Sequence, residues 1–101
     1  MIIQMAGKNF ELTEAIKEHV EMALRSRFDA YEGLIVKADV VCEAYHEPRG
    51  GQPSARVKLE LELPGPDIIV EKEGDDLYEL VNIVAGVAYE QVEKRKEKGE
   101  I

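Results

Sequence analysis

The side chains that could do chemistry are few and are spread along the chain. The sequence has two histidines, His19 and His46, and a single cysteine, Cys42. His19 recurs with apolar residues at helical spacing, and Cys42 falls on the apolar side of an alternating segment, so both are expected in structural roles. A catalytic centre needs a nucleophile, a base or a metal cluster held in a pocket. We therefore expect no enzyme activity and no catalytic residue.

Motifs for metal or phosphate binding do not stand out either. The sequence has no CxxC pair and no EF-hand spacing, and Gly50-Gly51 lacks the strand–turn–helix context of a phosphate loop. Asp75 and Asp76 are explained by capping of a helix. Four further carboxylates alternate along predicted strands and are expected on a solvated face of a sheet: Glu60, Glu62, Glu71 and Glu73. We expect no metal and no cofactor.

The charge balance restricts the partners of this chain. Its 101 residues include 13 Lys and Arg against 21 Asp and Glu, for a formal net charge of −8. Nucleic-acid binders usually carry a basic face, because much of their affinity comes from counterions released from phosphates. Binding to RNA would therefore depend on a local basic patch, acting within a Debye length of about 8–10 Å.

The apolar segments and the cysteine count indicate the compartment. No apolar run approaches the roughly 20 residues that a membrane span requires, and no signal-peptide pattern is present. A single cysteine cannot form an intramolecular disulfide, which fits a reducing environment. We expect a cytoplasmic protein that does not bind membranes.

Two helices are predicted to position the charged side chains. Apolar residues recur at helical spacing from about 14 to 31 and again from 76 to 92, while the charged tail over 93–100 is expected to fray. Thr13 is the expected N-cap of the first helix and Gly33 its stop. Asp76, with Glu79 three positions later, is expected to cap the second.

The strands are predicted from alternation with a period of two. Apolar and charged residues alternate in three segments, 36–44, 55–63 and 68–73, which are predicted to be strands. Val36 is among the positions predicted to be buried. Residues 2–6 form a further short strand. The connection over 46–53 is expected to be mobile, and 64–67 forms a tight turn. The fold class is α+β in the order βαβββα. It has a four-stranded sheet with two helices packed on its apolar face, in one domain over 1–101.

Blocks near both ends of the chain resemble the ribosome hibernation-promoting factor and ribosome-associated inhibitor family, also called sigma-factor modulation proteins. They are Gly7-Lys8 with residues 11–20, residues 73–79, and Gln91 with residues 93–98. The resemblance runs nearly from end to end and is most specific in the outer blocks. It implies a fold like that of a double-stranded-RNA-binding domain. It also implies ribosome hibernation under stress, by the short form that lacks an additional dimerisation domain.

The resemblance further implies a mode of action and a set of contact residues. Members of the family inhibit translation by occupying the channel of the small ribosomal subunit in which mRNA and tRNAs lie. Basic side chains on their helices contact ribosomal RNA, mainly at phosphates, which position the protein without reading sequence. Carried over to this chain, the RNA-binding residues are Lys8, Lys17, Arg25, Arg27, Lys94, Arg95, Lys96 and Lys98.

The chain departs from the family in the second helix. Members commonly carry a basic–hydrophobic–acidic–basic–Gln run, whereas residues 87–91 have Val87 and Glu90 at the two basic positions. Gly86, in the helix interior, costs about 1 kcal/mol relative to Ala. The alternative is therefore the same fold with a lost RNA surface, acting as a protein-interaction module or homodimer through its helix flanks or an open sheet edge. Val87 and Tyr89 fit either such a contact or packing on the flank, and Lys94 to Lys98 fit a solvated helix end.

Overall fold

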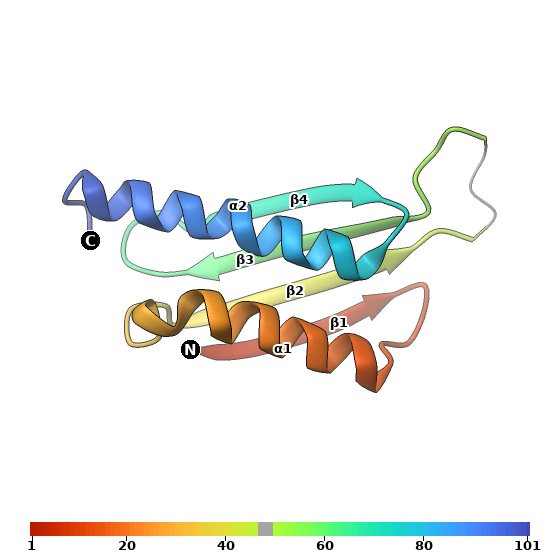
Figure 1. Cartoon of the computed structure of the whole chain (residues 1–101), viewed down its shortest axis with the longest axis horizontal. Helices are drawn as coiled ribbons and strands as arrows, with labels where there is room; N and C mark the ends of the chain where they lie inside the picture. The colour runs from red at the N-terminus through yellow and green to blue at the C-terminus, as the bar shows by residue number, and fades with distance from the viewer. Residues whose placement is uncertain (47–49) are drawn as a thin grey trace.

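A computed structural model describes residues 1–46 and 50–101. The elements follow in the order β1 (Ile2–Lys8), α1 (Glu14–Phe28), the short 3₁₀ helix η1 (Asp29–Tyr31), β2 (Lys37–Ala44), β3 (Ala55–Glu62), β4 (Ile68–Gly74) and α2 (Leu77–Glu97). The four strands form one sheet in the order β1-β2-β3-β4, and both helices lie on the same face of it (Figure 1). The predicted α+β fold with the order βαβββα is confirmed.

The pairing of the strands follows from the lengths of their connections. β1 and β2 are parallel, because α1 carries the chain back across the sheet between them. β2, β3 and β4 pair antiparallel and form a meander, because short connections join them. The two helices run in the same direction, so their C-terminal ends lie at the same end of the molecule (Figure 1).

The core lies between the helices and one face of the sheet. Alternate residues of β2 and β3 point toward the helices, and the cross-strand pairs Val40–Leu59 and Cys42–Val57 are buried there. The helices contribute an apolar stripe each, with the largest fully buried side chains Leu24 and Phe28 on α1. The opposite face of the sheet carries charged residues and is left uncovered by the helices.

The first helix begins as predicted but ends differently. The Thr13 side-chain oxygen accepts a hydrogen bond from the Ile16 amide at 3.2 Å, which confirms the N-cap. α1 ends at Phe28, and the chain continues through η1, where the carbonyl of buried Tyr31 accepts bonds from the Leu34 and Ile35 amides at 2.9 and 3.0 Å. Gly33 does not adopt the left-handed conformation, so the prediction that it stops the helix is wrong.

The second helix is longer than predicted, and both of its ends are capped. Asp76 caps it by accepting bonds from the Tyr78 and Glu79 amides at 2.9 and 3.3 Å. The tail does not fray. α2 continues to Glu97, and Gly99, with a φ of 73°, donates to the Lys96 carbonyl while Glu100 donates to that of Arg95, both at 3.0 Å. This is a Schellman C-cap, which satisfies the last carbonyls of the helix.

Three smaller predictions fall near the ends of strands. Asp75 does not cap α2, since it accepts hydrogen bonds from the amide and hydroxyl of Ser54 at 3.0 and 3.2 Å and so ties the start of β3 to the end of β4. Val36 precedes β2 and is 56% exposed, so its predicted burial is wrong. The predicted mobile connection over 46–53 includes residues 47–49, which lie outside the described residues.

Candidate nucleic-acid interface

The predicted RNA-binding cations divide into two groups by their ion pairs. Lys8, Lys17 and Arg25 each have a carboxylate oxygen within 4 Å. The other five have no such partner anywhere in residues 1–46 and 50–101: Arg27, Lys94, Arg95, Lys96 and Lys98. Arg27 belongs to α1, three of the others lie in the last turns of α2, and Lys98 follows directly as its C-cap.

Lys8 is separated from the others by the whole sheet. It pairs in register with Glu43 on β2, and its ammonium lies 3.8 Å from that carboxylate on the face opposite the helices. Glu43 is buried, with only 6% of its surface exposed, and its other carboxylate oxygen accepts a hydrogen bond from the Arg56 guanidinium at 2.5 Å. Lys8 lies at the end of the sheet where α2 begins, so roughly 30 Å of helix separates it from the tail of α2. The structure does not bring Lys8 together with the C-terminal cations.

The cations on the outer flank of α1 are neutralised locally. Lys17 pairs with Glu14 one turn earlier at 3.4 Å. Arg25 bonds to Glu21 at 2.8 Å and to Glu32 at 2.7 Å, and the hydrogen bond to Glu21 raises the pKa of the guanidinium. Such exposed pairs add little to stability, but they reduce the net positive charge that this flank presents.

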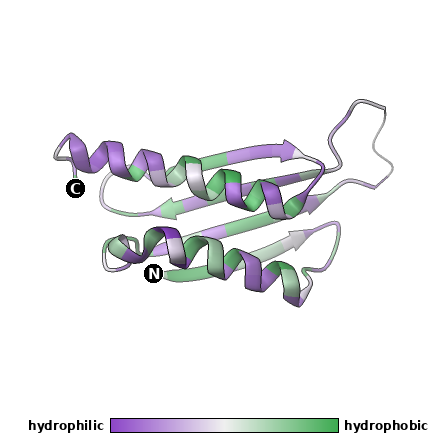
Figure 2. Cartoon of the chain, in the orientation of Figure 1, coloured by the Kyte–Doolittle hydropathy of each residue, from purple (hydrophilic) through white to green (hydrophobic). Residues whose placement is uncertain are grey.

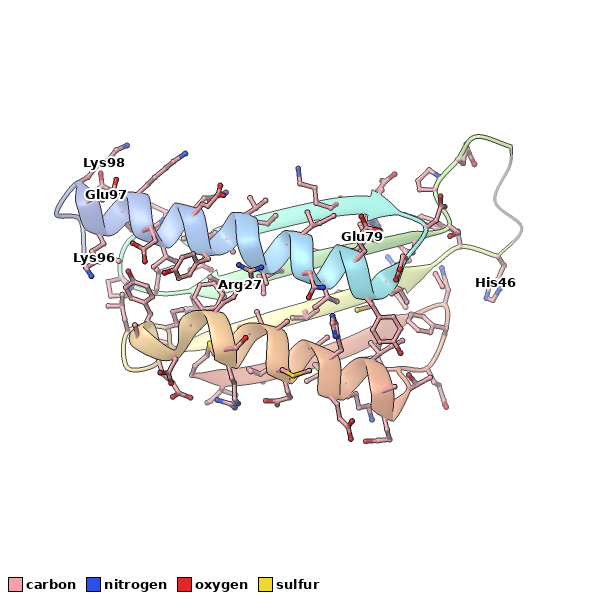
Figure 3. The ribbon with its side chains drawn as sticks, viewed as in Figure 1. Arg27, His46, Glu79, Lys96, Glu97 and Lys98 are labelled. Atoms are coloured by element: carbon pink, nitrogen blue, oxygen red, sulfur yellow. The ribbon has the colours of Figure 1, made fainter. Side chains whose placement is uncertain are left out.

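Arg27 instead lies in the groove between the helices, over Gly86 of α2 (Figure 3). A Cβ atom at Gly86 would lie 3.7 Å from the guanidinium carbon and from both terminal nitrogens of Arg27. Three equal distances mean that the planar guanidinium lies flat over the glycine. An alanine methyl group would therefore fit beneath the guanidinium at ordinary van der Waals distance, whereas a longer side chain at this position would need the space that Arg27 occupies.

Aromatic side chains join the ends of the two helices beside this cation. The Tyr31 hydroxyl donates to Glu93 on α2 at 2.6 Å. Tyr89 packs edge-on against Phe28 and Tyr31, with ring centroids 5.8 and 6.2 Å away. The hydrogen bonds from Tyr31 and Tyr89 lower the pKa of Glu93, and the bond to Glu93 raises the pKa of Tyr31 to about 12. The tyrosines therefore engage Glu93, the carboxylate directly before the basic tail.

The basic tail itself is fixed to the rest of the fold at two points. The Lys96 ammonium lies 5.6 Å from the centroid of the Tyr31 ring, within the range of a cation–π contact. The Arg95 guanidinium donates to the Pro64 carbonyl, in the turn between β3 and β4, at 3.1 Å. Lys94 and Lys98 are exposed, and this end of α2 is the most hydrophilic part of the helix (Figure 2). Cations here also suit the negative end of the helix dipole.

The remaining candidate residues have structural roles. Tyr89 and Val87 are half-buried against the core, which is the flank packing that the sequence left open. His19 donates from Nε2 to the Tyr78 carbonyl at 3.1 Å, joining the two helices. Cys42 is buried, and burial raises the pKa of its thiol to about 11.

The described residues hold no group of three or more metal-ligating side chains, and none of their helices has the length and apolarity needed to cross a bilayer.

Sequence reasoning missed the aromatic cluster and the role of Gly86. The spacing of Tyr89 and Glu93, one helical turn apart, was a local signal that the two could interact. Tyr31 lies 62 residues before Glu93, and no periodicity relates the two positions. The sequence indicated only that Gly86 destabilises the helix, because Arg27, which lies over it, belongs to a distant segment of the chain.

Comparison with known proteins finds relatives that agree with one another. Residues 3–100 match the family described as Sigma 54 modulation protein / S30EA ribosomal protein. The chain is 34% identical over 95 residues to the ribosome hibernation promotion factor of Deinococcus radiodurans, covering 94% of this chain and 49% of that protein. It is 22% identical over 98 residues to the ribosome hibernation promoting factor of Pseudomonas putida, covering 97% and 89%. The chain thus spans about half the length of the Deinococcus relative.

Two solved structures share the fold. The N-terminal domain of Thermus thermophilus Protein Y superposes with a TM-score of 0.76 at 33% identity, over 93% of this chain and 98% of that one. A ribosomal subunit interface protein from Coxiella burnetii superposes with a TM-score of 0.80 at 25% identity, over 96% and 99%.

Proposed function

The chain belongs to the Sigma 54 modulation protein / S30EA ribosomal protein family, and from this premise we propose that it is a ribosome-associated hibernation factor of the cytoplasm. It acts as a non-catalytic inhibitor of translation. The domain over residues 1–101 binds ribosomal RNA of the small subunit and occupies the channel that mRNA and tRNAs would use. Two relatives named as ribosome hibernation factors support the ribosomal role.

The proposal of RNA binding is supported by one observation: some of the candidate cations form ion pairs within the chain, whereas others do not. Arg27, Lys94, Arg95, Lys96 and Lys98 lie on the helical side of the molecule, without a carboxylate oxygen within 4 Å in the described part of the chain. They can therefore approach phosphates without first breaking an ion pair. The net charge of −8 opposes binding at long range, but screening confines its effect to about 8–10 Å in physiological salt.

The contacts are expected to position the domain rather than to read a sequence. Lys94 and Lys98 are exposed point charges suited to phosphate oxygens, and Arg27 offers a planar fork that is already oriented over Gly86. Tyr31 and Tyr89 support this surface from below by holding the end of α1 against α2. The domain inhibits by occupying space, so no bond needs to be made or broken.

Co-sedimentation with purified small ribosomal subunits across a salt series tests the proposal. The unmodified chain should bind, and binding should weaken steadily as salt rises, because counterions are released from the RNA. The double variant Lys94→Glu/Lys96→Glu should bind more weakly and lower the slope of log affinity against log salt by roughly two, one for each lost phosphate contact.

A control variant separates local contacts from net charge. Lys37→Glu/Lys58→Glu makes the same change in charge on the sheet face opposite the helices and should leave most of the affinity. Equal losses in both variants would show that only overall charge matters. No binding of the unmodified chain, even at low salt, would overturn the proposal and leave the family resemblance as one of fold.

A further inference from the structure

One edge of the sheet is open for pairing with another chain. β1 is an edge strand, and within the described residues it pairs only with β2. The Ile2 amide donates to the Val36 carbonyl on the β2 side. Because backbone groups of a strand alternate in direction, the N–H and C=O groups of Ile3 and Met5 point away from the sheet. Six of the seven residues of β1 are uncharged, so the edge lacks the charges that usually protect such strands.

A shallow groove follows this edge on the helical side of the sheet. One part, of about 540 Å³, lies between Met5 and the outer flank of α1, where Met22 is 65% exposed. An adjoining part of about 340 Å³ continues past Gly7 to Phe10 and Leu12. Met5 and Lys17 line both parts, so the groove runs alongside β1. Its floor offers apolar contacts to alternate side chains of any strand that pairs with β1.

The rim of the groove is acidic. Its carboxylates are Glu11, Glu14, Glu18 and Glu21, and its cations are Lys17 and Arg25. Lys17 is already paired with Glu14, and Arg25 with Glu21 and Glu32. In the described chain, Glu11 and Glu18 have no cation within 4 Å. The groove therefore presents uncompensated negative charge beside free backbone groups and exposed methionine.

We propose that the β1 edge binds an extended basic segment of a partner protein, which adds to the sheet as a fifth strand. Backbone bonds to Ile3 and Met5 hold the segment, every second side chain enters the groove beside Met5 and Met22, and lysines or arginines between them meet Glu18 and Glu11. β1 forms one edge of the sheet, whereas α2, which carries most of the proposed RNA-binding cations, packs on β3 and β4 toward the other edge, so both surfaces can be occupied together (Figure 1).

The negative charge of the rim favours a basic segment over two other possible ligands, a nucleic acid and a second copy of the chain. A nucleic acid would meet four carboxylates beside two cations that are already paired. A second copy of the chain, pairing antiparallel about Met5, would place the Glu18 and Glu21 flank against its own image, and like charges in contact are unfavourable. A basic strand can form hydrogen bonds to the free backbone groups, pack apolar side chains on the floor and pair its cations with the acidic rim at the same time.

A synthetic ten-residue peptide of alternating valine and lysine, capped at both ends, is the probe. Fluorescence anisotropy measures its affinity, and amide hydrogen exchange followed by NMR locates it. Binding should slow the exchange of the Ile3 and Met5 amides, which point away from the sheet in the free protein. A peptide of alternating valine and glutamate should not bind. The same lysine peptide with N-methyl groups on every second residue keeps its charge but cannot pair, and it should lose roughly tenfold or more in affinity.

Matched variants of the protein complete the test. Glu18→Lys should lower the affinity for the lysine peptide roughly tenfold, whereas Glu73→Lys, the same change on the opposite sheet face, should have little effect. Lys94→Glu/Lys96→Glu should leave peptide binding intact, so that failure here is distinct from failure of RNA binding. Equal binding of the N-methylated peptide, or no slowing of exchange at Ile3 and Met5, would overturn the proposal. So would a dimer of the unmodified chain in sedimentation equilibrium that occludes these amides.

Discussion

The two helices carry similar mixtures of charge but present them differently. On α1, Lys17 and Arg25 are each bonded to a carboxylate three or four residues away in the same helix. On α2, Lys94 and Lys96 have acidic neighbours at the same spacings and pair with none of them within 4 Å in the described residues. The tertiary contact from Tyr31 explains part of the difference, because its hydroxyl engages Glu93 at 2.6 Å.

This comparison shows that a count of charges does not predict an electrostatic surface. From residue 85 to 101 there are four cations and four carboxylates, a balance that by itself predicts a poor RNA-binding surface. A carboxylate that is held by a hydroxyl keeps its charge but does not fix a lysine in place. The same net charge can therefore form a closed network, as on the flank of α1, or leave cations free to meet a phosphate, as at the end of α2.

The largest effect is expected when the two helices are separated at their C-terminal ends. Phe28 is fully buried and packs against Tyr89, so Phe28→Ala removes a core side chain and the support of the cluster. We expect a loss of about 3–5 kcal/mol in the free energy of unfolding, measured by urea denaturation. Met22→Ala, on the exposed side of the same helix, is the control and should change it by less than about 0.5 kcal/mol. Similar losses in both would contradict the assigned core.

The comparison of the helices is tested directly by truncating their cations in pairs. Lys94→Ala/Lys96→Ala should reduce the salt dependence of small-subunit binding by roughly two in slope, because neither cation has to leave an ion pair in the described residues to contact a phosphate. Lys17→Ala/Arg25→Ala removes the same charge from the paired flank and should change the slope by much less. Indistinguishable slopes for the two variants would remove the distinction between paired and unpaired cations.

Gly86 allows the position of Arg27 to be varied without changing its charge. A methyl group at this site meets the guanidinium at 3.7 Å, an ordinary contact, so Gly86→Ala should stabilise the helix by up to about 1 kcal/mol and preserve binding. Gly86→Leu needs the space that Arg27 occupies and should weaken binding to the small subunit while the circular-dichroism spectrum stays that of the folded protein. Unchanged binding in Gly86→Leu would show that the placement of Arg27 over the glycine has no function.

The smallest effect is expected from the titration of the tyrosine–carboxylate contact. The pKa of Tyr31 is raised from 10.0 to about 12 by its bond to Glu93, so the folded state holds this proton more tightly than the unfolded state. The stability that results is present below pH 10 and is lost as the pH rises from 10 to about 12. Tyr31→Phe should remove a late-titrating phenol from the near-ultraviolet absorbance curve and flatten this part of the stability profile. A curve that loses an early-titrating phenol instead would contradict the contact.

The sequence by itself determined most of the architecture of this protein. Period-two alternation placed β2, β3 and β4 to within about a residue, and Thr13 and Asp76 marked the starts of the helices, because both signals depend on neighbours a few positions away. It was wrong about two helix ends, which depend on contacts from distant residues and, for α2, also on a glycine cap that the periodic pattern does not show. α1 gives way to η1 where buried Tyr31 anchors the chain, and α2 extends past Glu93 because Tyr31, Pro64 and the Gly99 cap hold it.

Only the tertiary structure decided which charges are available. The family resemblance proposed eight candidate cations, but the sequence did not indicate that Lys8 lies on the far face beside Glu43, nor that Arg27 rests on Gly86. These contacts join residues 35 to 59 positions apart, and such pairs leave no periodic trace in the chain. Secondary structure follows from local patterns, whereas the electrostatics of a surface depend on which distant side chains the fold brings within a few ångströms of each other.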